Sequence, residues 1–313
     1  MFFCYYPLHY CRRDILMPRL LPLLARFASH TAFGLLVAAG LVAYAGPASA
    51  DSSTAALESA LRSEVALVFD LDDNAVLYEK NSSDLKPIAS ISKLMTALVV
   101  IESGQPMDEV LTISEDDIDR MRHSRSRLAV GTRLTRAEML HLSLMSSENR
   151  AANALGRYYP GGMPAFVRAM NDKARALGMR HSHFVEPTGL SSENVATSRD
   201  LVKLLQAASR HPEIRDYATD DTEIFEVGRG RRLTYNNTNR LVKRDDWEIL
   251  ISKTGFINEA GRCLVMLTRI DQRDVAIVLL NSTGSYSRIG DAVRIRKLVE
   301  TSGQTLAMAA AGS

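Results

Sequence analysis

The chain has 313 residues, of which 46% are hydrophobic and 24% are charged, proportions typical of a globular protein with one large domain or two closely packed ones. The formal net charge is only +2, so the overall charge does not indicate a nucleic-acid-binding protein. The three cysteines lie at Cys4, Cys11 and Cys263, and none has the Cys/His spacing of a metal site. We therefore expect no metal and no cofactor.

An apolar stretch over residues 31–44 follows basic residues and ends in small residues up to Ala50. This order is typical of a secretory signal peptide, with cleavage expected after Ala50. An uncleaved membrane anchor is the alternative, but the stretch is shorter than the ~20 residues that a spanning helix needs. Met17 is an alternative start of the chain. Cys263 is then the single cysteine of the mature protein, and its apolar surroundings predict a buried, unreactive thiol.

Beyond the leader, residues 64–70 and 75–79 read as two β-strands, and the Asp-Asp-Asn turn between them predicts a β-hairpin. Apolar residues then recur at helical spacing directly after Ser90, which places Ser90 at the N-terminus of a predicted helix. From about residue 114 to residue 211 the pattern is helical. Further helices are predicted after the capping box that begins at Thr135, after Asn149, and over residues 163–177 and 198–209.

Strand character returns in the last third of the chain. The predicted strands cover residues 223–227, 247–254, 262–269 and 274–281. Turn signals between the last three strands predict an antiparallel meander. Residues 286–300 fit a closing helix, and the small residues of the tail at 305–313 favour disorder.

These elements predict an α+β fold, in which an antiparallel sheet built from both ends of the chain is flanked by helices and carries an inserted all-helical lobe. A ligand site is expected in the cleft between the lobes. The predicted divisions are a signal peptide at 1–50, a catalytic domain at 51–302 with its sheet lobe at 51–112 and 215–302 and its helical lobe at 113–214, and a disordered tail at 303–313.

The first motif that carries chemistry is Ser90-x-x-Lys93. On a helix, residues three apart share a face, so the Ser90 hydroxyl and the Lys93 amine can meet. A lysine whose pKa is lowered by burial or by neighbouring cations can act as the base that activates a serine nucleophile. A second match at residues 83–86 is followed by Pro87, which disfavours a helix, so we interpret it as a solvated turn.

The second motif, Ser147-Glu148-Asn149, lies between two predicted helices. The Ser147 hydroxyl can relay a proton to a leaving amine, and the Asn149 amide can hold a backbone group of a substrate. The same triplet recurs at residues 192–194 in a polar turn, where side-chain capping explains it without chemistry. The first triplet is therefore the candidate.

The third motif, Lys253-Thr254-Gly255, ends an apolar strand. The Lys253 cation and the Thr254 hydroxyl suit a carboxylate next to a scissile bond, and Gly255 lets a substrate backbone approach the strand edge. The backbone N–H of Phe256 can complete an oxyanion hole, in which each donor is worth roughly 2.7–4 kcal/mol. Each motif alone is more simply explained by ordinary surface residues, so the interpretation depends on all three.

In this order the three motifs resemble those of the penicillin-recognising serine enzymes. The longer strings at 87–96, 184–191 and 253–264 are similar to the low-molecular-mass D-alanyl-D-alanine peptidases of family S11, in particular to the endopeptidase branch called penicillin-binding protein 7/8. The resemblance covers about residues 65–281. It implies the fold of serine β-lactamases and DD-peptidases, with Ser90 as the acylated nucleophile, Lys93 as the base, Ser147 as the proton relay, and Asn149, Lys253, Thr254, Gly255 and the backbone of Phe256 in substrate binding.

The resemblance implies a D-alanyl-D-alanine endopeptidase that cuts D-Ala–diaminopimelate crosslinks of peptidoglycan in the periplasm and is inhibited by β-lactams. A D-alanyl-D-alanine carboxypeptidase is the nearest alternative, and a non-catalytic module that binds wall peptides is a further one. A class A β-lactamase needs a separate glutamate in a Glu-x-x-Leu-Asn context, which we do not find in the sequence. A basic stretch at 229–244 is interpreted as a solvated hairpin.

Overall fold

The structure is a computed structural model that describes residues 57, 59–228 and 230–311, with side chains described up to Thr301. The expected signal peptide, its cleavage after Ala50 and the alternative start at Met17 lie outside the described residues. Within the described part of the chain, no helix is both long and apolar enough to cross a membrane.

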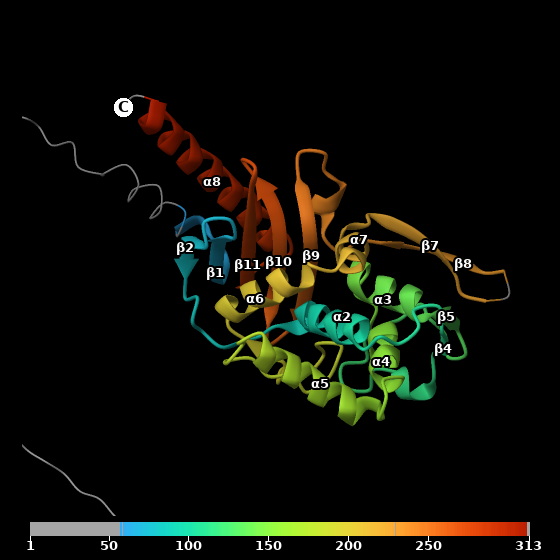
Figure 1. The fold of residues 1–313 in the computed structure, drawn as a ribbon. Coiled ribbons are helices and arrows are strands. Elements are labelled where there is room, and N and C mark those ends of the chain that lie inside the picture. Colours follow the sequence, from blue (N-terminus) through green and yellow to red (C-terminus); the bar gives the residue numbers. More distant parts are fainter. Residues whose placement is uncertain (1–56, 58, 229, 312–313) are drawn as a thin grey trace, which may run out of the picture. The chain divides into compact units, whose positions relative to one another are not determined.

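A five-stranded antiparallel sheet forms the centre of the fold, in the order β2-β1-β11-β10-β9 (Figure 1). Its strands are β1 (Ser63–Asp70), β2 (Ala75–Lys80), β9 (Glu248–Ile257), β10 (Gly261–Ile270) and β11 (Arg273–Ser282). Because β1 pairs with β11, with Ser63 opposite Ser282, the sheet joins the first and last strands of the described chain. The predicted sheet built from both ends of the chain is confirmed.

Helices cover both faces of this sheet. On one side α8 (Ser287–Ala311) packs against β1, β10 and β11, and on the other side α6 (Ser198–Ala208) contacts the same strands (Figure 1). The buried side chains of each strand alternate accordingly: Leu264 and Met266 belong to the core beneath α8, whereas Val265 belongs to the larger core on the other side. This period of two is the pattern of a sheet covered on both faces.

The segments between β2 and β9 form a mainly helical lobe, which also contains three small strand pairs (Figure 1). Its helices are α2 (Ser92–Glu102), α3 (Arg136–Met145), α4 (Asn149–Arg157), α5 (Gly162–Ala176) and α7 (Pro212–Thr219), with short 3₁₀ helices η1 (Ala89–Ile91), η2 (Glu115–Asp117) and η3 (Arg240–Lys243). The strand pairs are β3 (Lys86–Pro87) with β6 (Val195–Ala196), β4 (Val110–Thr112) with β5 (Arg133–Thr135), and β7 (Thr222–Glu226) with β8 (Arg232–Asn236).

The capping box predicted from Thr135 to Glu138 is present at the start of α3. The Thr135 hydroxyl accepts from the Glu138 backbone N–H at 3.2 Å, and the Glu138 carboxylate accepts from the Thr135 backbone N–H at 2.7 Å. The reciprocal bonds satisfy two backbone donors that the helix itself leaves free. The capping box therefore fixes where α3 begins, and α3 ends directly before the segment that contains Ser147.

Two predictions of local structure are wrong. Ser90 does not begin an α-helix but lies in the 3₁₀ turn η1, directly before α2. Ala89 has a φ of 48°, so the chain enters this turn from a left-handed conformation that helical periodicity does not indicate. Disorder is expected for the tail at 303–313, whereas α8 continues to Ala311, and the alanines, leucine and methionine of this segment favour helix.

Candidate active site

Ser90 and Lys93 meet at the junction of η1 and α2. The Lys93 ammonium group donates to the Ser90 hydroxyl oxygen at 3.0 Å, and the Ser90 hydroxyl lies 3.3 Å from the carbonyl oxygen of Thr188. Ser90 is half-buried, whereas Lys93 is fully buried. The three-residue spacing therefore brings the two groups together although the first residue is in a 3₁₀ turn.

The Lys93 side chain is held by two further acceptors, the Asn149 side-chain oxygen at 2.7 Å and the Thr188 carbonyl oxygen at 2.5 Å. Burial lowers the pKa of Lys93 from 10.5 to about 8, and the nearby carboxylates of Glu186 and Glu148 partly oppose this shift. A lysine with this pKa has an appreciable neutral fraction near neutral pH. It can therefore accept the proton of the Ser90 hydroxyl.

The pH dependence of Ser90 acylation follows from this pKa. With the neutral amine of Lys93 as the reactive form, which the resemblance implies, the second-order rate of acylation by penicillin should rise about tenfold per pH unit below the Lys93 pKa of about 8 and level off above it. Stopped-flow measurements from about pH 6 to about pH 9.5 give this profile directly. A rate that is flat across this range would contradict a role for Lys93 as the base.

The loop that carries Thr188 is organised by Glu186. The Glu186 carboxylate accepts from the backbone N–H groups of Thr188 at 2.6 Å, Gly189 at 2.7 Å and Ser191 at 3.2 Å. Asn194 belongs to the repeated triplet at 192–194, and it is fully buried against this loop. Its side-chain amide donates to the Ser92 hydroxyl at 2.9 Å. The second triplet is thus structural, but its Asn194 packs beneath the Ser90 turn rather than in a solvated cap.

Ser147 and Asn149 form a second wall of the site. Ser147 has a φ of 62°, and this left-handed residue turns the chain from α3 into α4, whose N-cap is Glu148. The Ser147 hydroxyl accepts from the Lys253 ammonium at 2.9 Å. Asn149 bonds Lys93 through its oxygen and the Ser124 hydroxyl through its nitrogen, at 2.9 Å. Through Ser147 and Asn149, this wall contacts two lysines that belong to separate motifs.

The third wall is the edge strand β9. Lys253 is fully buried, and the Thr254 hydroxyl bonds the Thr238 hydroxyl at 2.7 Å. A Cβ atom on Gly255 would lie 3.0 Å from the backbone nitrogen of Ser90, so glycine permits the close approach of β9 to the Ser90 turn. Phe256 is the next residue along β9, and the role expected for its backbone N–H in an oxyanion hole together with that of Ser90 stays a prediction.

Arg288 is a residue of the site that sequence analysis missed. Its guanidinium donates to the Gly255 carbonyl oxygen at 3.0 Å from the start of α8, and its Nε is buried with no hydrogen-bond partner in the described chain. No local pattern distinguishes this arginine from an ordinary helix-surface residue. Only the packing of α8 onto the sheet places it behind β9.

The site concentrates positive charge along β9. The pKa of Lys253 lies well below its ordinary value because of burial first, and then because of the cations Lys93 and Arg288. The pKa of Arg288 is lowered by burial and by Arg262, whose guanidinium lies 4.8 Å from the centre of the Phe256 ring. Repulsion of this kind is relieved when an anion binds, so this side of the site is suited to a carboxylate.

All eight residues predicted for the site lie around one centre. Ser90 and Lys93 stand between the wall of Ser147 and Asn149 and the strand segment from Lys253 to Phe256. Cys263 is fully buried on the neighbouring strand β10, opposite Gly255, and burial raises the pKa of its thiol to about 11, as expected of an unreactive cysteine. A serine beside a buried lysine, a second serine and a cationic strand are the arrangement of a serine acyl-transfer enzyme of the penicillin-recognising class.

Comparisons with known proteins identify the family. The model of the peptidase S11 family, described as D-alanyl-D-alanine carboxypeptidase, matches residues 51–284. The chain is 47% identical over 256 residues to a D-alanyl-D-alanine endopeptidase of Pseudomonas aeruginosa, covering 82% of each chain. It is 45% identical over 251 residues to one of Escherichia coli, covering 80% of this chain and 81% of that one. The protein therefore belongs to the S11 peptidases, a family of serine hydrolases.

Solved structures agree with this assignment. The DD-transpeptidase of Streptomyces K15 superimposes with a TM-score of 0.71 at 26% identity, over 76% of this chain and 97% of that one. Penicillin-binding protein D2 of Listeria monocytogenes, solved with cefotaxime bound, gives a TM-score of 0.65 at 27% identity over the same fractions. The predicted fold class and the predicted resemblance to the endopeptidase branch are confirmed.

Proposed function

We propose that the protein is a D-alanyl-D-alanine endopeptidase that hydrolyses D-Ala–diaminopimelate crosslinks of peptidoglycan through an acyl-enzyme on Ser90. The observation that carries this proposal is the contact of the buried, pKa-shifted Lys93 with Ser90 at 3.0 Å, beside a cationic strand that suits a carboxylate. The relatives named endopeptidase, at 45% and 47% identity, support the choice of reaction.

In the proposed mechanism, neutral Lys93 removes the proton of the Ser90 hydroxyl as its oxygen attacks the D-alanyl carbonyl carbon. The backbone N–H groups of Ser90 and Phe256 receive the oxyanion of the tetrahedral intermediate. The C–N bond then breaks, and the amine of diaminopimelate leaves with a proton delivered through Ser147. A water molecule attacks the acyl-ester and gives a proton to Lys93, which returns it to the Ser90 oxygen as the C–O bond to Ser90 breaks. The donor stem is released with the free carboxylate of its D-alanine.

The leaving group accounts for the cations of β9. The D-centre of diaminopimelate bears a carboxylate beside the scissile amide, as does the terminal residue of a D-Ala-D-Ala peptide. Thr254 and Lys253 lie on the strand that this carboxylate would approach, with the Arg288 guanidinium behind them. Binding the anion offsets the repulsion that lowers the pKa values of Lys253 and Arg288.

The same chemistry would serve a carboxypeptidase, the activity for which the family and relatives at 28% identity are named. The higher identity to the endopeptidases makes crosslink cleavage the proposed reaction. We further propose that the protein acts in the periplasm after export by its leader at 1–50, and that β-lactams acylate Ser90. The cefotaxime-bound relative supports the last point.

Product analysis tests the choice between the two reactions. Protein beginning at Asp51 is incubated with a diaminopimelate-crosslinked muropeptide dimer and, separately, with a monomer that ends in D-Ala-D-Ala. We expect the dimer to be cut into monomers that keep their D-alanine, and the monomer to be turned over far more slowly. Rapid release of terminal D-alanine with intact dimer would instead identify a carboxypeptidase.

A further inference from the structure

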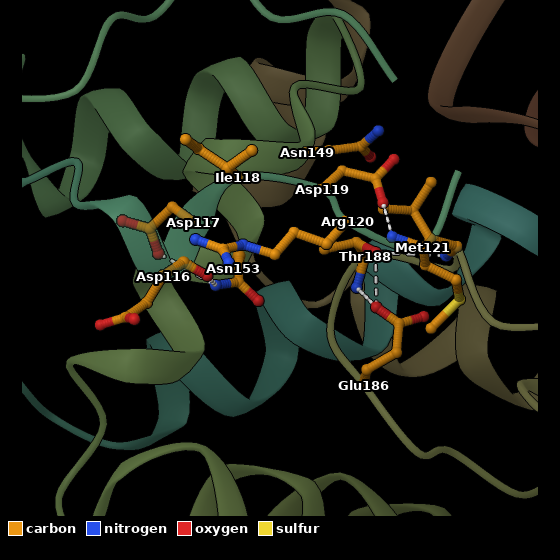
Figure 2. A pocket seen from close by; sticks show the side chains of 11 residues that line it. Asp116, Asp117, Ile118, Asp119, Arg120, Met121, Asn149, Asn153, Glu186 and Thr188 are labelled. Atoms are coloured by element: carbon orange, nitrogen blue, oxygen red, sulfur yellow. Dashed lines mark hydrogen bonds between the residues drawn. The ribbon is translucent and has the colours of Figure 1, made fainter. Parts of the chain in front are cut away.

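A pocket next to the catalytic groups is not used by the proposed mechanism. It has a volume of about 350 Å³, and Asn149 and Thr188, which both contact Lys93, form part of its lining (Figure 2). The cations that would hold the leaving-group carboxylate, Lys253 of β9 and Arg288 of α8, lie at the other wall of the site. A peptide bound with its carboxylate at β9 would therefore extend its acyl-donor side towards this pocket.

Most of the pocket's carboxylates already have partners within the protein. Asp117 is paired with Arg157 at 2.8 Å, and Asp119 accepts from three backbone N–H groups at 2.8–2.9 Å. Glu186 holds the Thr188 loop, as described above. These three carboxylates therefore stabilise the walls of the pocket. Because they are already paired, they are less available to a ligand than an unpaired carboxylate.

Two charged side chains of opposite sign remain at the pocket. In the described part of the chain, neither Arg120 nor Asp116 forms a side-chain hydrogen bond or an ion pair, and both are exposed. Figure 2 shows the Arg120 side chain extending across the pocket, with Asp116 at its rim. The apolar side chains of Met121 and Leu190 also line it. The pocket thus combines an apolar lining with one free cation and one free anion.

We propose that this pocket binds the side chain of the residue that precedes the D-alanine of the acyl donor, and that Arg120 and Asp116 select a side chain ending in both a carboxylate and an ammonium group. Arg120 binds the carboxylate, Asp116 binds the ammonium, and the apolar lining covers the methylenes. The free D-centre of a diaminopimelate residue has this chemistry. The inference rests on the proposed function, because it assumes a D-alanyl peptide as the acyl donor.

Two crosslinked dimers that differ in one group test this selectivity. Both have diaminopimelate in the acceptor stem, and the donor stem carries either diaminopimelate or lysine, which keeps the ammonium but lacks the side-chain carboxylate. The wild-type protein is expected to cleave the diaminopimelate donor with the higher kcat/KM. In Arg120→Gln this preference should fall about tenfold, as expected for the loss of one charge-assisted hydrogen bond.

Arg125→Gln is the matched control, because Arg125 is an exposed arginine of the same loop that does not line the pocket. It should leave the preference unchanged. Acylation by penicillin, which lacks the donor side chain, shows that the catalytic groups of each variant are intact. An Arg120→Gln protein with the wild-type preference would overturn the inference alone. Failure of the wild-type protein to cleave either dimer, despite acylation by penicillin, would overturn the proposed function and with it this inference.

Discussion

Lys93→Met is expected to lower the rate of Ser90 acylation by about 10³-fold, within the range typical for removal of a general base. Methionine has a similar length but no proton acceptor, so the Ser90 hydroxyl keeps its proton when it meets a carbonyl carbon. The acylation rate is measured with a fluorescent penicillin under single-turnover conditions. A loss smaller than about tenfold would show that another group activates Ser90.

The stability of Lys93→Met separates this loss from unfolding. The ammonium group is fully buried and its pKa is lowered by burial, so the wild-type fold bears an electrostatic cost that methionine removes. The substitution also leaves the Thr188 carbonyl and the Asn149 side chain without their donor. Because the two effects oppose each other, we expect a thermal unfolding midpoint close to that of the wild-type protein.

Gly189→Ala is expected to lower the acylation rate by about 10²-fold or more by displacing the Ser90 turn. Gly189 has a φ of +79°, and a Cβ atom there would lie 1.9 Å from the carbonyl oxygen of Ala89 and 2.7 Å from the backbone nitrogen of Ser90. No real contact is this short, so either the Thr188 loop or the Ser90 turn must move. Both movements separate Lys93 from its acceptors and disturb the oxyanion site, for which small misplacements cost about 10²-fold in rate.

Gly178→Ala is the matched control for this steric argument. Gly178 has a similar φ of +70°, but a Cβ atom there meets nothing within 4 Å. It therefore carries the strain of a left-handed alanine, about 1 kcal/mol, without a collision. Thermal unfolding should show a modest loss of stability with normal acylation for Gly178→Ala. Equal acylation rates for the two variants would contradict the close packing of Gly189 on the Ser90 turn.

Local sequence patterns predict most of the sheet and the catalytic pair. The strand pattern at 64–70 and the meander from 247 onward depend on alternation over a few residues, and the structure has strands there. The spacing of Ser90 and Lys93 is equally local, and it brings the two groups within 3.0 Å. These features are predictable because neighbouring residues along the chain determine them.

Features that depend on distant segments were not predictable. Arg288 joins the site only because α8 packs onto the sheet, and the left-handed φ of Ala89 is accommodated by Gly189, a hundred residues away. The structural role of Asn194 was expected, but its burial under Ser92 was not, because its sequence resembles a solvated turn. In each case the position of the residue depends on a contact with a distant segment, and the sequence around the residue does not indicate that contact.

The most direct test of the account is the intact mass of the protein, beginning at Asp51, after incubation with penicillin. We expect an increase by the mass of one penicillin molecule, located by peptide mapping on Ser90. Ser90→Ala should show no increase and should leave the crosslinked muropeptide dimer uncut. An adduct on another residue, or a Ser90→Ala protein that still cleaves the dimer, would contradict the claim that Ser90 carries the acyl group.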